Sequence, residues 1–267
     1  MYAKKFVACF LTLLNFDFVQ PTVLKEDHPF DLVIFTQFWP QTVCKEWKEH
    51  NPSHTCAMPA KKDSWTIHGV WPTKLGTKTP AFCNRTWLFD PEEVRPIEKD
   101  LLAMWPNIEV ESAYTLWAHE WNKHGTCAAV LEPLNSQLKY FQQGLTWLQK
   151  YFIYDILKEA NIVPSDNKEY LIEDIYQAVL KNVSVRPAIE CDREHGGNFI
   201  VEVRLCFSKK LELVDCDGIA FHDMEEYGSI LTNCNPNSGV YYLENAVPKT
   251  VYVQLYKLLS WLQWFTL

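Results

Sequence analysis

The sequence has no excess of positive charge: 25 Lys and Arg residues stand against 33 Asp and Glu residues, a formal net charge of −8. Surfaces that bind nucleic acids are usually basic, so any phosphate site in this chain must be local. The 267 residues also contain no internal repeat, no low-complexity tract and no visible domain linker. With 48% apolar and 14% aromatic residues, the composition indicates an ordered globular protein of one large or two small domains.

No apolar run is long enough to be a clear membrane span. Near the N-terminus, Lys4 and Lys5 precede a short apolar run over residues 6–14, which is typical of a secretory signal peptide. We assign the signal to residues 1–20, although no A-x-A cleavage pattern follows and Asp17 comes early. A packed or disordered N-terminal segment is the alternative.

The C-terminal residues 251–267 (VYVQLYKLLSWLQWFTL) are strongly apolar, with a polar residue at every third position. This length, with Lys257 inside it, is marginal for a membrane span. We expect residues 247–267 to form a tail that packs on the domain or lies on a partner or membrane surface. A removed GPI signal is a further alternative.

Cysteine is plentiful, and its count is informative. Cys9 falls inside the presumed signal, which leaves eight cysteines in the remaining chain. An even number in a secreted protein predicts disulfides, although spacing leaves 105 connectivities open. Two glycosylation sequons, at Asn84 and Asn182, agree with passage through the secretory pathway. Proline excludes a third at Asn51.

Apolar alternation predicts strands, and apolar residues three to four apart predict helices. The expected strands cover residues 31–39, 64–72, 185–191, 199–207 and 211–216. The expected helices cover residues 91–104, a segment around 117–125, one or two helices within 135–159, and 169–181. Pro40 is expected to close the first strand, and residues 44–56 to form a loop. This order favours an α+β fold, a mostly antiparallel central sheet flanked by helices.

One segment, WAHEWNKHGTC (residues 117–127), crowds four ionisable residues together: His119, Glu120, Lys123 and His124. In an α-helix, which turns by about 100° per residue, all four fall on one side. Trp117 and Trp121 fall at the edge of that side or behind it, where they can anchor the helix in a core. Gly125 is expected to end the helix as a C-cap.

Three interpretations of this segment are open. A solvated polar face usually carries Lys and Glu rather than two histidines among tryptophans. For zinc, the metalloprotease pattern H-E-x-x-H sets its histidines about 40° apart, whereas the spacing here sets them about 140° apart. That spacing splays the imidazoles, and Lys123 adds positive charge beside any metal. Acid–base chemistry on a phosphate is the third interpretation, and it needs another histidine.

SWTIHGVWP (residues 64–72) supplies that histidine. Its alternation predicts a strand that breaks at Gly69 and stops at Pro72. An isolated His68 would more often be an ordinary core or surface residue, but Trp65 and Trp71 flank it near a strand end. SWTIHGVWP and HEWNKHGTC resemble the two active-site segments of the ribonuclease T2 family, in the same order and at a fitting separation.

The resemblance covers roughly residues 31–245 and implies an α+β domain over residues 25–246. It implies four disulfides, which pair Cys44 with Cys56, Cys83 with Cys127, Cys191 with Cys234, and Cys206 with Cys216. It also implies an endoribonuclease whose RNA supplies the nucleophile, the 2′-hydroxyl, so that a 2′,3′-cyclic phosphate forms. Two histidines near their ordinary pKa suit the two proton transfers.

By resemblance, His124 is the base and His68 the acid; the residues themselves leave this assignment open. Glu120 would orient or polarise the site, Lys123 would stabilise charge on the phosphate, and His119 would hold it. Trp71 matches a tryptophan that stacks on bases in fungal relatives. Some of these have Asp two positions later, where Thr73 stands here, so low base specificity is expected.

Gln37 and Trp39 are expected to line the cleft, with core packing the alternative for Trp39. We therefore expect a secreted or lysosomal acid endoribonuclease that cleaves single-stranded RNA and not DNA. It should need no metal, no cofactor and no obligatory protein partner. A catalytically idle relative, acting in binding or storage, is the alternative. An idle protein, however, has no chemical reason to keep all five of the following residues: His68, His119, Glu120, Lys123 and His124. A zinc hydrolase is the third possibility.

Overall fold

The computed structural model describes residues 30–77, 79–110, 112–193, 197–220, 225–227 and 230–246. The predicted signal peptide (residues 1–20) and the apolar tail (residues 247–267) lie outside them. Within the described part of the chain, no helix is both long and apolar enough to cross a bilayer.

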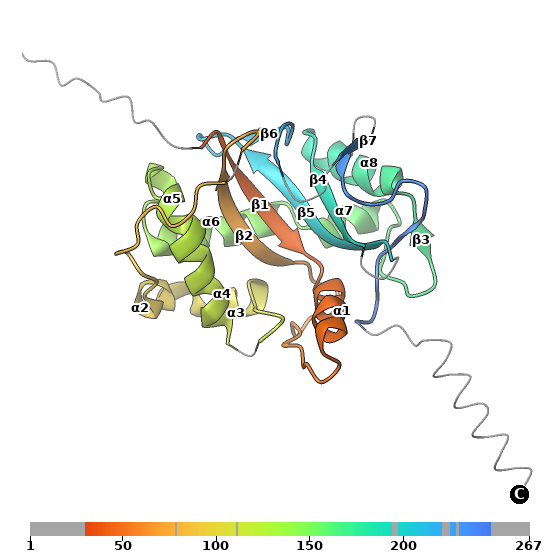
Figure 1. The fold of residues 1–267 in the computed structure, drawn as a ribbon, viewed down its shortest axis with the longest axis horizontal. Coiled ribbons are helices and arrows are strands. Elements are labelled where there is room, and N and C mark those ends of the chain that lie inside the picture. Colours follow the sequence, from red (N-terminus) through yellow and green to blue (C-terminus); the bar gives the residue numbers. More distant parts are fainter. Residues whose placement is uncertain are drawn as a thin grey trace, which may run out of the picture.

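A twisted sheet forms the centre of the fold (Figure 1). Its main path follows the order β2-β1-β5-β4-β8-β7, and the pairings β4–β8 and β5–β9 are parallel while the other described pairings are antiparallel. The strands are β1 (Leu32–Phe38), β2 (Thr66–Thr73), β3 (Glu169–Tyr170), β4 (Ala188–Asp192), β5 (Phe199–Phe207), β6 (Leu213–Val214), β7 (Glu225–Tyr227), β8 (Ile230–Thr232) and β9 (Val240–Tyr241). The prediction of a mostly antiparallel α+β fold is confirmed.

Helices surround this sheet, with α6, α7 and α8 behind it and α2 to α5 beside the edge strand β2 (Figure 1). The α-helices are α1 (Pro40–His50), α2 (Pro91–Val94), α3 (Glu98–Met104), α4 (Ala113–Glu120), α5 (Thr126–Ala128), α6 (Gln137–Lys150), α7 (Ile153–Glu159) and α8 (Ile172–Val183). Two 3-10 turns, η1 (Arg95–Ile97) and η3 (Glu132–Leu134), and a π-helical turn, η2 (Trp121–Gly125), complete the set.

The two faces of the sheet have different characters because side chains alternate along each strand. Val33 and Phe35 of β1 point into the main apolar core, where Trp147 of α6 stacks on Phe207 of β5 with ring centroids 3.9 Å apart. The opposite face has a smaller apolar cluster around Leu32 and Ile34, and polar side chains farther along the strands. These polar side chains form the site described below.

Helix α1 corrects the expectation that Pro40 ends an element and that a loop follows. Proline has no amide hydrogen to donate, which is no loss in the first turn of a helix, and Pro40 begins α1 in that role. The buried side of α1 includes Cys44, which forms a disulfide with Cys56, and Lys45, whose Nζ lies 2.8 Å from Asp192 Oδ2. Tertiary contacts therefore hold a helix whose sequence pattern is polar.

The structure contains four disulfides: Cys44–Cys56, Cys83–Cys127, Cys191–Cys234 and Cys206–Cys216. These are the pairs that the family resemblance implies. Cys127 lies in α5, directly after η2, so its bridge ties the loop around Cys83 to the end of that turn. The amide of Phe82 supports the same junction by donating to the Lys123 carbonyl at 2.9 Å. The sequon residues Asn84 and Asn182 are both exposed.

The Cys83–Cys127 bridge closes a segment of 44 residues, and the chain-entropy relation gives it about 4 kcal/mol of stability. The Cys83→Ser/Cys127→Ser variant should lose about that much in urea unfolding, together with activity per folded molecule on RNA. The Cys206→Ser/Cys216→Ser variant is the control, since its 10-residue segment gives about 3 kcal/mol and does not touch η2. Equal activity of both variants would contradict the idea that the first bridge holds η2.

Candidate active site

The segment with two histidines is not a plain α-helix. Helix α4 passes into the π-helical turn η2, in which the amide of Thr126 donates to the carbonyl of Trp121, five residues earlier. Residues five apart therefore come closer to the same side than in an α-helix, and π-turns are frequent at functional sites. The prediction that Gly125 ends the helix is wrong, because the helix continues through Gly125 into α5. A Cβ on Gly125 would lie 2.3 Å from Trp121 Cε3, which explains the glycine.

This turn corrects the predicted splay of the imidazoles. One ligand atom from each of His119, Glu120 and His124 lies within 4.8 Å of the others. The geometric argument against zinc is therefore wrong. The electrostatic argument remains, because Lys123 in the same turn adds to burial in lowering the pKa of His119 and of His124. The predicted anchors hold: Trp117 and Trp121 are fully buried.

His124 is buried, and its environment favours the neutral imidazole. Burial lowers its pKa well below the ordinary value, and the charges of Lys123, His119 and His68 act in the same direction. Its Nδ1 atom is buried and has no hydrogen-bond partner among the residues that the structure describes. A charged imidazolium would leave a buried N–H unpaired there, so His124 rests in the neutral form, in which a general base must start.

His68 lies at an irregularity in the edge strand β2. Thr36 of β1 pairs with Gly69 and Gln37 pairs with Ile67, so His68 is the extra residue of a β-bulge. The strand continues through Gly69 and Pro72, contrary to prediction, because an edge strand tolerates proline. The His68 carbonyl accepts a hydrogen bond from Trp105 Nε1 at 2.9 Å, which holds the bulge in place.

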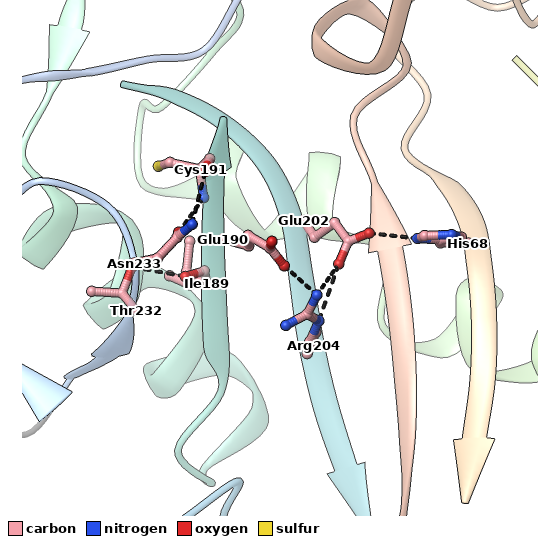
Figure 2. A network of polar contacts seen from close by, with 8 residues as sticks. All are labelled: His68, Ile189, Glu190, Cys191, Glu202, Arg204, Thr232 and Asn233. Carbon is pink, nitrogen blue, oxygen red and sulfur yellow. Dashed lines mark hydrogen bonds and ion pairs between the residues drawn. The ribbon is translucent and has the colours of Figure 1, made fainter. Parts of the chain in front are cut away.

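The His68 side chain has a carboxylate partner. Its Nδ1 lies 2.5 Å from Glu202 Oε1, and Figure 2 shows the two side chains facing each other across β1. Burial opposes the charged imidazolium, but the charge of Glu202 and the hydrogen bond outweigh it, so the pKa of His68 is raised. His68 and His124 therefore have opposite electrostatic environments.

Glu120 links the two predicted motifs. It is buried, and its Oε2 accepts a hydrogen bond from Trp71 Nε1 at 2.8 Å. Burial raises its pKa to about 7, although His68, the Trp71 hydrogen bond and Lys123 oppose the rise. Trp71 itself lies between the histidines, with its ring centroid 4.9 Å from that of His68 and 5.6 Å from that of His124.

The residues predicted to bind the RNA base or line the cleft are buried in the structure. Trp71 is only 6% exposed and packs against both histidines, so it is no open stacking platform in this structure. Gln37 is fully buried: its Nε2 donates to the Tyr151 carbonyl at 2.6 Å, and its Oε1 accepts from the Ile153 amide. The structure makes Gln37 a core residue, not a cleft residue, because its side chain points to α7. Trp39 is likewise in the core.

A cavity of about 300 Å³ lies beside His68 and His119. Phe38, Leu116 and Val201 supply apolar parts of its wall, and Glu46 and Glu202 supply carboxyl groups. Burial and the nearby Asp192 and Glu202 raise the pKa of Glu46 to about 8. A larger open groove of about 800 Å³ beside α7 and α8 contains none of the predicted site residues.

Sequence reasoning missed Glu202 and Arg204. Both lie on β5, on the face opposite the main core, and both are almost fully buried. The signal was present in FIVEVRLCF (residues 199–207), where two opposite charges two residues apart interrupt an apolar strand. A buried strand carries such a pair only where the charges find partners.

Known proteins resemble this chain over most of its length. The sequence model of the Ribonuclease T2 family matches residues 30–216. Ribonuclease Oy of Magallana gigas is 38% identical over 188 residues, 68% of this chain and 85% of that protein. Ribonuclease T2 of Sus scrofa is 36% identical over 196 residues, 71% of this chain and 90% of that protein. The crystal structure of RNase NT in complex with 5′-AMP, 29% identical, aligns with a TM-score of 0.66 over 80% of this chain and 98% of that one.

Replacing Gln37 distinguishes a core residue from a substrate contact. Gln37→Met keeps the volume but leaves the Tyr151 carbonyl and the Ile153 amide without partners, so unfolding free energy should fall by about 2–3 kcal/mol. The KM for RNA of the folded protein should not change. Gln142→Met, at an exposed position of α6, should change neither quantity. A raised KM of the Gln37→Met variant, with unchanged unfolding free energy, would show that Gln37 contacts the substrate.

Proposed function

Because this chain belongs to the ribonuclease T2 family and is a ribonuclease, we propose that it cleaves single-stranded RNA by transphosphorylation, with His124 as the general base and His68 as the general acid. The RNA 2′-hydroxyl attacks the adjacent phosphate while His124 takes its proton. His68 then protonates the departing 5′-oxygen, and a 2′,3′-cyclic phosphate remains. Two proton carriers are enough because the nucleophile belongs to the substrate.

The opposite environments of the two histidines carry this assignment. A base must start neutral, and burial with neighbouring positive charge lowers the pKa of His124. An acid must start protonated, and Glu202 overcomes burial to raise the pKa of His68. The family resemblance implies this assignment and the residues themselves leave it open, so the asymmetry of the two pKa shifts is the structural observation that supports the choice.

The remaining residues act on the phosphate in this proposal. Lys123 supplies positive charge where negative charge grows on the phosphoryl oxygens. His119, whose pKa is lowered by burial and by Lys123, holds an oxygen as a neutral donor. Glu120, with its pKa raised to about 7, offers either a proton or a charge near neutrality and orients the site through Trp71. The mechanism uses no metal.

The substrate and location follow from the same chemistry. DNA lacks the 2′-hydroxyl and so should resist cleavage. The RNase NT structure holds 5′-AMP, a mononucleotide, which agrees with an RNA substrate here. We propose low base specificity because Trp71 is buried against His68 and His124 and presents no open ring face on which a base could stack. We propose a secreted or lysosomal location because four disulfides require an oxidising compartment.

Replacing either histidine should abolish most of the turnover. His68→Ala and His124→Ala should each lower kcat on the order of 10²–10⁴-fold. In the wild type, kcat/KM should fall as the pH drops through the lowered pKa of His124, and again as it rises through the raised pKa of His68. His50→Ala, at an exposed position, is the control. Near-wild-type rates for His124→Ala would refute the mechanism.

The products provide an independent test. Mass spectrometry of an RNA oligonucleotide digest should find 2′,3′-cyclic phosphate ends, and the same sequence with 2′-deoxyribose or 2′-O-methyl ribose should stay intact. EDTA should leave the rate unchanged, whereas a zinc hydrolase would lose activity. Efficient cleavage of DNA, or 5′-phosphate ends from RNA, would rule the proposal out. No cleavage of any RNA by pure folded protein would favour the idle relative.

A further inference from the structure

We propose that Glu202 and Arg204 are positioning residues for His68: Arg204 holds one oxygen of Glu202, so that the other accepts a hydrogen bond from Nδ1–H of His68 and Nε2 is presented to the substrate. This inference rests on the proposed role of His68 as the acid. It adds a second layer of residues to the site, from strands β5 and β4, that neither sequence motif contains.

The sheet places Glu202 opposite the bulge. Strand β1 lies between β2 and β5, and Phe38 of β1 pairs with Glu202 in the ladder. Because His68 is the extra residue of the bulge, its side chain leans across β1 toward β5, as Figure 2 shows. Phe38 and Trp71 contact the imidazole edge-on, with ring centroids 5.3 and 4.9 Å from it. The ring is therefore fixed on two sides as well as at Nδ1.

The two carboxylate oxygens of Glu202 have separate partners. Arg204 donates to Oε2 from Nε at 3.0 Å and from Nη2 at 2.6 Å, while Oε1 faces His68 Nδ1 at 2.5 Å. Arg204 Nη2 also donates to Glu190 of β4, and Figure 2 shows these side chains in one row across the sheet. Since Glu202 is 6% and Arg204 3% exposed, neither can turn away into solvent.

This division fixes the protonation pattern of the imidazole. Burial opposes ionisation of Glu202, but Arg204 and His68 outweigh it and lower its pKa to about 2. Glu202 therefore stays an acceptor, and the neutral form of His68 must keep its proton on Nδ1. Among the described residues, Nε2 of His68 makes no hydrogen bond, so this atom is left to gain and release the catalytic proton.

Several other titrating groups face His68 and Glu202, so an activity profile is not a sufficient test. They are Glu120 of α4, with a pKa of about 7, Glu190 of β4, also about 7, Glu46 of α1, about 8, and the histidines His119 and His124, whose pKa values are lowered. Each changes the field at His68 as pH changes. The proton positions on His68 itself must therefore be observed.

The decisive variant is Glu202→Gln. Arg204 should draw the amide oxygen to itself, which turns the amide NH₂ toward Nδ1 and reverses the neutral tautomer to Nε2–H. Nitrogen-15 NMR of the ring, recorded without RNA and at a pH above the pKa of His68, where the ring is neutral, should show Nδ1–H in the wild type and Nε2–H in the variant. Both Glu202→Gln and Glu202→Ala should lose on the order of 10²-fold or more in kcat, with KM less affected.

Removal of the Arg204 guanidinium should restore part of the kcat that Glu202→Gln loses. In Glu202→Gln/Arg204→Met, no guanidinium holds the amide oxygen, so the amide can present it to Nδ1, and kcat should recover about tenfold over Glu202→Gln. Thr36→Val is the control for disturbance of this sheet face, because Thr36 pairs with Arg204 and its buried hydroxyl has no hydrogen bond within the described residues. It should keep wild-type kcat and the Nδ1–H tautomer.

The outcomes separate the two proposals. If His68→Ala is inactive while both Glu202 variants keep wild-type kcat and tautomer, the positioning role is wrong and the acid role stands. If His68→Ala is fully active, the proposed function fails, whereas the tautomer measurement still reports on Glu202. An unchanged tautomer in a well-folded Glu202→Gln protein, checked by urea unfolding, would overturn the inference regardless of activity.

Discussion

The hydrogen bond from Trp71 Nε1 to Glu120 Oε2 is the contact on which the site depends, because it joins the edge strand β2 to the helical segment α4–η2. Trp71 and Glu120 are 49 residues apart in sequence, and their elements bring the two proposed proton carriers, His68 and His124, together. A Cβ on Gly69 would fall 2.0 Å from Trp71 Nε1 and 2.3 Å from Glu120 Oε2, so only glycine permits this approach. Trp71 thus sets the spacing between the two proposed proton carriers, His68 and His124, and contacts both.

The proposed site needs positive charge, whereas the chain as a whole has a formal net charge of −8. In the proposed mechanism an acidic protein must hold a phosphate, and the positive charge for this comes from Lys123 and protonated His68, which are set among buried carboxyl groups. Those carboxyl groups differ in charge: burial raises the pKa of Glu120 and Glu190 to about 7, while Arg204 and His68 lower that of Glu202 to about 2. A permanent anion beside His68, and burial with positive charge around His124, suit the two histidines to their proposed roles as acid and base.

Sequence reasoning identified what depends on local pattern and residue chemistry. The buried Trp117 and Trp121, strand β5 and the α+β class follow from spacing and composition, and the resemblance of two motifs to the ribonuclease T2 family brought His68 and His124 together. It failed where long-range contacts decide: Pro40 begins a helix that a disulfide and a buried ion pair hold, and Gln37 turns to α7 instead of the cleft. The partner of His68 could not be found because Glu202 is distant in sequence and is placed by the strand register.

Both histidines lie where a regular element carries one residue more than its ideal pattern. The π-turn η2 closes over five residues instead of four, and β2 bulges at His68. Such insertions rotate a side chain away from its regular direction but free a backbone carbonyl, which must find another donor. Trp105 Nε1 binds the carbonyl of His68, and the amide of Phe82 binds that of Lys123. The disulfide at Cys83 then holds Phe82 beside η2, so the same bridge that stabilises the fold also supports the irregular turn that aims His124.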